Sequence, residues 1–174
     1  MTKLISISDF SGYPAISTNV NTAKKLDPYI TEAQRFDLLP ILGQELYWDL
    51  INDFTASPSL VEYGDLFNGS EYTISGKTFK HEGLKPALIY FTYARYRMNA
   101  NEEETAGGLV TKNNPYSEPA SEKTIARRVD QARSAAFAYM EPVIKFLNDK
   151  HLDYPLWANS CKGSNKRSTR ITGI

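Results

Sequence analysis

The strongest constraint on the fold is a long amphipathic stretch between Ser121 and about Lys150. Its apolar residues recur at steps of three and four, which places them on one stripe of a helix. They are Ile125, Val129, Ala132, Ala136, Tyr139, Val143 and Leu147. Such a stripe needs a partner, and residues 84–104 supply one with Leu84, Leu88, Phe91, Arg95 and Met98 at a similar step. We therefore expect a mainly α fold, a small helical bundle centred on these two long helices.

Shorter helices are expected before this pair. Asp27 followed by Pro28 is a good helix start, because aspartate caps free amides and proline tolerates the first helical position. That helix should reach about Leu39, where Pro40 and Gly43 interrupt it. A second helix should run from Gln44 to about Phe54, with one apolar face. Its face residues are Leu46, Tyr47, Leu50 and Phe54. Residues 55–68 are rich in turn formers and predict a connection with one short helical turn.

A β-hairpin is predicted at residues 71–81. Two short runs that contain residues common in β-strands flank a Ser-Gly turn. Its glycine, Gly76, can take a positive φ. An isolated hairpin is marginal in water, so it should pack on the helices or on a neighbouring subunit. Further along, residues 108–112 predict a short strand, Ser121 is a plausible helix cap, and Pro142 predicts a kink in the last helix.

The chain length of 174 residues fits one domain. We expect an extended N-terminal arm at residues 1–20, a helical domain at 21–157, and a basic C-terminal tail at 158–174. Residues 160–174 hold four of the 20 bases and none of the 20 acids, so the rest of the chain carries a net charge of minus four. The four tail bases are Lys162, Lys166, Arg167 and Arg170.

The single cysteine, Cys161, excludes an intramolecular disulfide and fits a reducing compartment. No apolar run approaches the length of a membrane span, so we expect no membrane contact and a location in the cytoplasm of the cell that makes the protein.

Motifs for catalysis, cofactors or metals are not recognisable. His81 and His151 are far apart in sequence and lack second ligands at zinc spacing. Glu102, Glu103 and Glu104 are read as a solvated helix end. Gly107-Gly108 lacks the residues of a phosphate loop. The chain is therefore not expected to be an enzyme or to bind a cofactor.

The run from Ile89 to Met98 is unusually rich in tyrosine. Its aromatic residues surround the helix axis, so core packing explains about half of them and a subunit interface the rest, with Tyr93 and Tyr96 as interface candidates. Stacking on nucleic acid, helped by Arg95 and Arg97, is the rival interpretation.

Three segments resemble a known family in order and spacing. They are ITEAQRFDLLPILGQELYWDL from Ile30, YGDLFNGSEYTISGKTFKHEGLKPALIYFTYARY from Tyr63, and GGLVTKNNPYSEPASEKTIARRVDQARSAAFAYMEPVIKFL from Gly107. Together they resemble the head-to-tail connector, or adaptor, proteins of tailed bacteriophages, especially phages of Bacteroidetes, including the crAss-like group.

The resemblance implies a structural virion protein of the neck region, assembled in the host cytoplasm. Such subunits form a ring of twelve that docks on the portal, extends the DNA channel and receives the next tail component. It implies that Trp157 and the basic tail reach the portal, and that the hairpin around Gly76 and the loop from Gly107 to Ser121 contact neighbouring subunits or the tail. A neutral or acidic channel wall would let DNA slide without specific binding.

The alternative is a nucleic-acid-binding regulatory or packaging protein that uses the basic tail and the tyrosine-rich helix. DNA retention that is lost on deletion of residues 160–174 would favour it.

Overall fold

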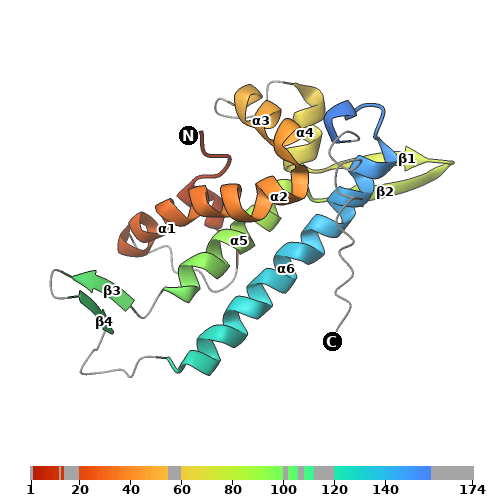
Figure 1. Cartoon of the computed structure of the whole chain (residues 1–174). Coiled ribbons are helices and arrows are strands. Elements are labelled where there is room, and N and C mark those ends of the chain that lie inside the picture. The colour runs from red at the N-terminus through yellow and green to blue at the C-terminus, as the bar shows by residue number, and fades with distance from the viewer. Residues whose placement is uncertain are drawn as a thin grey trace, which may run out of the picture.

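Two long helices, α5 (Leu84–Met98) and α6 (Glu122–Asp149), pack along each other at the centre of the molecule (Figure 1). The computed structural model describes residues 2–11, 13, 20–54, 60–99, 102–105, 108–111 and 120–157. α1 (Val20–Ala33) contacts α5 as well, so α5 has a helix on two sides. The predicted mainly α class, centred on two long helices, is confirmed.

The remaining elements are short. A 3-10 turn spans Ile7–Phe10, a π-helical turn spans Gln34–Leu38, and α2 (Leu39–Leu42), α3 (Gln44–Asp53) and α4 (Val61–Asn68) follow. β1 (Ser70–Ile74) pairs antiparallel with β2 (Lys77–His81), and β3 (Glu102–Thr105) pairs antiparallel with β4 (Gly108–Thr111). The two hairpins form separate two-stranded sheets.

The sequence of α6 explains both its start and its buried face. The Ser121 hydroxyl accepts a hydrogen bond from the Thr124 amide at 3.3 Å, which confirms Ser121 as the cap. Of the predicted stripe, five residues are buried, and Ile125 and Tyr139 are half-buried. The buried five are Val129, Ala132, Ala136, Val143 and Leu147. The helix runs through Pro142 as one element (Figure 1).

The end of α5 differs from the prediction. The helix stops at Met98, and Glu102–Glu104 lie in strand β3 instead of at a solvated helix end. Leu84, Leu88 and Phe91 are buried as predicted, but Met98 is exposed. The predicted strand at residues 108–112 is β4.

The first helix also differs, because α1 starts at Val20 and includes Pro28 in its interior. Asp27 forms an ion pair with Lys3 instead of capping a helix. Leu26, Ile30 and Ala33 share a buried face that begins before the proline. Burial of this face outweighs the single backbone hydrogen bond that a proline removes.

The helical path also continues past Leu39, where the sequence predicted an end. The Leu39 amide donates to the Gln34 carbonyl, five residues back, which widens one turn ahead of Pro40. α2 then continues to Leu42, and Gly43, with a φ of 79°, ends it. The predicted interruption therefore holds at Gly43 but not at Pro40.

α3 and the first hairpin match the prediction from the sequence, whereas α4 is longer than predicted. The predicted apolar face of α3 is buried throughout. α4 is an eight-residue helix instead of one turn, because Tyr63, Leu66 and Phe67 share a buried face. The hairpin packs on α6 through the Tyr72 ring, which lies 5.0 Å from the Phe146 ring.

Both ends of the described chain join the core. Leu4, Ile5 and Phe10 are buried, and the Gln34 side chain binds the Leu4 amide at 2.8 Å and the Thr2 carbonyl at 3.1 Å. Residues 2–11 are thus a packed part of the domain, which corrects the expectation of an extended arm for this segment, whereas residues 14–19 of the expected arm lie outside the described residues. The predicted C-terminal tail, residues 158–174, lies outside the described residues.

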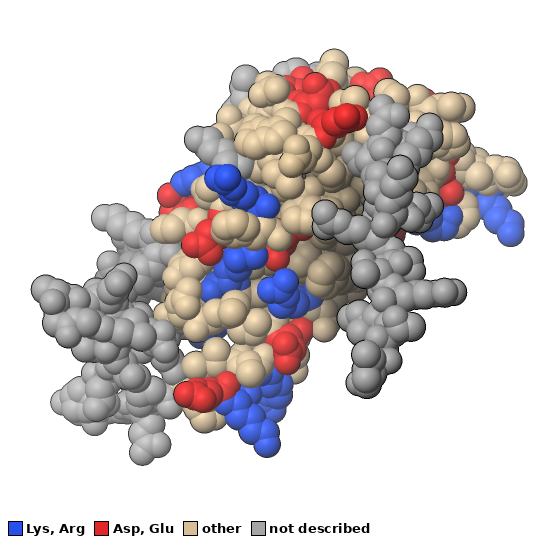
Figure 2. Space-filling view, viewed as in Figure 1, with Lys and Arg blue, Asp and Glu red and all other residues tan. Residues whose placement is uncertain are grey.

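Charge is unevenly distributed over the surface. Residues 44–68, which include α3 and α4, contain five acids and no base. These acids give the red area over α3 and α4 at the top of Figure 2. The exposed face of the first half of α6 carries Lys123, Arg127 and Arg128, at the opposite end of the molecule (Figure 1).

Candidate assembly surface

The residues expected at interfaces fall into three environments. Trp157 and Tyr93 are buried, with exposed fractions of 6% and 7%. The Trp157 indole donates to Asn148 Oδ1 at 3.0 Å, and Arg97 Nε donates to the Tyr93 hydroxyl at 2.9 Å. Neither side chain is presented to a partner, which corrects the prediction for both.

Tyr96 and Gly76 have different surroundings from those two. Tyr96 is half-buried against Tyr29, with ring centroids 6.0 Å apart. Gly76 lies exposed at the tip of the β1–β2 hairpin and remains a candidate contact point. The four predicted tail bases lie outside the described residues, as does most of the loop from Gly107 to Ser121.

The other aromatic residues of α5 are also used inside the fold. Tyr90 stacks on Tyr139 at 5.7 Å, and Phe91 meets Phe137 edge-on at 5.3 Å. Internal packing therefore accounts for these rings.

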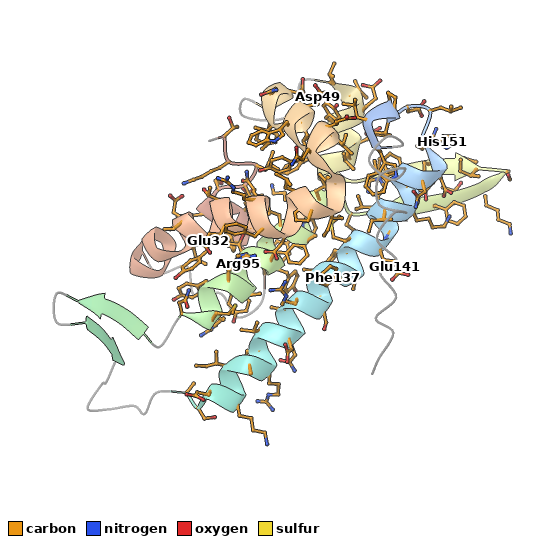
Figure 3. The ribbon with its side chains drawn as sticks, in the orientation of Figure 1. Glu32, Asp49, Arg95, Phe137, Glu141 and His151 are labelled. Atoms are coloured by element: carbon orange, nitrogen blue, oxygen red, sulfur yellow. The ribbon has the colours of Figure 1, made fainter. Side chains whose placement is uncertain are left out.

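A different group of residues forms the most distinctive surface feature, which we call the central patch. It lies where the end of α1, the π-helical turn, α5 and α6 meet, and Figure 3 labels three of its members. The patch consists of Glu32, Phe36, Asp37, Arg95, Arg133 and Phe137.

Asp37 is the hub of the patch. Its side chain is only 4% exposed, and Arg95 binds both of its oxygens, Nε to Oδ2 at 2.5 Å and Nη2 to Oδ1 at 3.1 Å. Arg133 Nη2 donates to Oδ1 at 3.2 Å. A two-pronged arginine contact fixes orientation as well as adding energy. One carboxylate therefore ties α5 and α6 to the π-helical turn.

Two large apolar rings lie exposed on this charged cluster. Phe36 is 58% exposed and lies under the Arg95 guanidinium, 5.2 Å from ring centroid to Cζ. Phe137 is 51% exposed, one helical turn after Arg133. Exposed aromatic rings next to positioned arginines are typical of protein–protein contact surfaces.

One feature of the sequence points to this patch. Arg95 falls on the expected apolar stripe of α5, and a charged residue at a core position requires a buried partner of opposite charge. The partner, Asp37, is 58 residues earlier in the chain. Only the three-dimensional fold shows that these two residues meet.

A second candidate is a hollow of about 360 Å³ between β2 and α6. His81, on its wall, is 2% exposed, and its ring lies 4.2 Å from the Phe146 ring. Burial lowers the pKa of His81, partly offset by the negative charge of Asp65. A neutral imidazole would also suit a base or a ligand, but the buried position of His81 against the Phe146 ring makes it a packing residue.

Among the described residues, no group of three or more His, Cys, Asp or Glu side chains could hold a metal ion. None of the helices in the described ranges is both long and apolar enough to span a bilayer.

Comparison with known proteins assigns the chain to a family. The model of a family described as a family of unknown function, DUF6712, matches residues 38–167. No curated protein and no solved structure matches the chain. The matched region includes α2 to α6, Trp157 and three of the four tail bases.

Proposed function

The chain belongs to DUF6712, a family of unknown function, and we propose that it is a structural virion protein that forms the head-tail connector ring of a tailed bacteriophage. The ring subunit docks on the portal, extends the DNA channel and links capsid to tail. Its partners are copies of itself, the portal protein and the next neck or tail protein.

The central patch is the observation that carries this proposal. Phe36 and Phe137 are each more than half exposed, on a surface held in place by a buried ion-pair cluster. A rigid, partly apolar surface can bind a protein without the ordering cost that a loose surface would incur. The geometry thus suits an assembly subunit.

The resemblance of three segments to connector proteins supplies the specific role. The alternative, nucleic-acid binding by the tyrosine-rich helix, has less support, because Tyr90, Tyr93 and Tyr96 each have an aromatic or arginine neighbour within the chain. Stacking on bases requires free ring faces.

Native mass measurement of the purified protein, alone and mixed with the portal protein of the same phage, tests the proposal. We expect a ring-sized complex with the portal that withstands salt, because contacts built on aromatic rings are weakly screened. A chain that stays monomeric and ignores the portal contradicts the proposal.

The central patch is tested by the double variant Phe36→Ser with Phe137→Ser. We expect loss of ring or portal association with an unchanged circular dichroism spectrum. Leu152→Ser is the matched control, since Leu152 is 83% exposed and lies outside the patch. If the control and the double variant behave alike, the patch is not the contact surface.

A further inference from the structure

The surface of α3 and α4 is strongly acidic. Glu45, Asp49, Glu62 and Asp65 are exposed and Asp53 is half-buried, while neither helix contains a lysine or arginine. The two helices are tied together, because the Tyr63 hydroxyl donates to Asp49. Burial and this carboxylate raise the pKa of Tyr63, so its hydroxyl is a neutral donor that adds no charge to the surface.

Exposed apolar side chains lie on the same two helices and the residue before them. Trp48 is 46% exposed, Leu60 52% and Val61 76%. The Leu60 amide donates to Asp53 Oδ2 at 3.2 Å, which places this apolar residue beside an acid. A segment that combines basic and apolar residues would complement such a surface.

The described chain ends next to this surface. The Tyr154 hydroxyl donates to the Glu62 carbonyl on α4 at 2.6 Å, and Trp157 is buried three residues later. Residues 160–174 then carry four bases, no acid, and the apolar residues Ile171 and Ile174. Ten residues of extended chain, from Trp157 to Arg167, span up to about 35 Å. α3, with ten residues, is about 15 Å long.

From this juxtaposition we propose that the acidic surface of α3 and α4 is the docking site for residues 160–174 of the same chain. Tethering by a short linker gives an effective concentration in the millimolar range, so even a weak intrinsic affinity keeps the chain's own tail on the site in the free subunit. The docked tail covers Trp48, Leu60 and Val61, and a partner that captures the tail uncovers them. The contact concerns the free subunit, so its test does not depend on the portal.

Cross-linking of the full chain tests this docking, with Cys161 as the natural thiol in the tail. Asn52→Cys places a second thiol on the exposed side of α3 without altering an acid. Ala138→Cys is the matched control, exposed on α6 about 15 Å from Asn148, the hydrogen-bond partner of Trp157. We expect a short bismaleimide to join Cys161 to the α3 thiol faster than to the α6 thiol, within single chains.

Reversing the charge of the tail, or raising the salt concentration, distinguishes electrostatic docking of the tail from a tail that is only near α3. The triple change Lys166→Glu, Arg167→Glu and Arg170→Glu should slow the α3 cross-link roughly tenfold, the sum of a few weak surface pairs. The α6 cross-link should change little. Salt at about 1 M should have the same effect, because it shortens screening to about 3 Å.

Three results overturn the proposal. The first is an equal cross-linking rate for the α3 and α6 thiols. The second is an α3 cross-linking rate that changes with neither salt nor charge reversal. The third is cross-linked dimers in place of cross-linked monomers. The salt series on the Asn52→Cys chain needs no further variant, so it decides the matter even if the reversed tail disturbs folding.

Discussion

Asp37 links three elements through one buried carboxylate, so its substitution should be strongly destabilising. Asp37→Asn keeps the shape but removes the charge, leaving Arg95, whose side chain is 19% exposed, without its main anion. Breaking a buried ion pair from one side typically costs about 3–5 kcal/mol. Because Arg133 is 40% exposed and water can screen it, we expect the lower end, about 3 kcal/mol, in urea unfolding.

Asp130→Asn is the matched control for this change. Asp130 is exposed on α6, and surface substitutions usually change stability by less than about 0.5 kcal/mol. If the two variants unfold at the same urea concentration, the Asp37 cluster does not stabilise the fold.

His81 should make stability depend on pH in the weakly acidic range. Burial lowers its pKa in the folded protein, so the unfolded chain takes up a proton at a higher pH than the folded chain does. Stability is therefore complete above the ordinary histidine pKa of about 6.5 and falls as pH drops below it. The loss is at most about 1.4 kcal/mol for each pH unit in which only the unfolded chain is protonated.

Urea unfolding at pH 7.5, 6.5 and 5.5 measures this loss. In His81→Gln the fall should disappear, whereas in His151→Gln it should remain, because His151 is exposed. Keeping the pH above 5 avoids the carboxylates, including Asp149, whose pKa is lowered by its bond to Lys145. An unchanged slope in His81→Gln would assign the effect to another group.

At the scale of elements, three glycines should respond differently to alanine. Gly64 lies inside α4 with open space around it, so Gly64→Ala should stabilise by about 0.5–1 kcal/mol. Gly76 has open space but a φ of 76°, so Gly76→Ala should cost about 1 kcal/mol. Gly83 combines a φ of 78° with the Phe67 carbonyl oxygen 2.3 Å from the added carbon, so its cost should be several times larger.

Urea midpoints of these three variants should follow the order Gly64→Ala, wild type, Gly76→Ala, Gly83→Ala. Each glycine is the control for the others, because the substitution is the same. A Gly83→Ala protein as stable as Gly76→Ala would mean that the turn before α5 can move aside at little cost.

Elements with a regular apolar period were predictable, and those defined by distant contacts were not. α6, α3 and the β1–β2 hairpin followed from periodicity, a cap and a Ser-Gly turn. Glu102–Glu104 form a strand because they pair with β4, a contact that local helix preference does not encode. The start of α1 was misplaced because Asp27 and Pro28 have the sequence of a helix start, whereas the helix already begins at Val20 and buries Leu26.

At the scale of the whole molecule, the candidate site was less predictable than the fold. Tyr93 was predicted at an interface because aromatic residues favour interfaces, and Trp157 because the connector resemblance implies a portal contact, yet both side chains are buried within the fold. The central patch depends on Asp37, Arg95 and Arg133 meeting from three elements far apart in sequence. Whether an aromatic residue is exposed depends on the neighbours that the fold places around it, and these are distant in sequence.

A substitution in the N-terminal segment tests whether the described part of the chain unfolds as one cooperative unit. Phe10 is 1% exposed and belongs to the same core as Leu88 and Met140 of the central helices. Phe10→Ala should cost about 3–5 kcal/mol, as for other large core truncations. If the core unfolds cooperatively, this loss of stability should speed amide exchange far from residue 10. The best-protected amides exchange only through global unfolding.

Hydrogen exchange of wild type and Phe10→Ala under native conditions measures that spread. Amides in the middle of α5 and α6 should exchange faster by the factor that the urea-derived stability loss predicts, and by the same factor in both helices. Ile7→Ala is the matched control, since Ile7 is half-buried on the same 3-10 turn and should cost less. Acceleration confined to residues 2–11 would mean that this segment opens on its own, as an arm would.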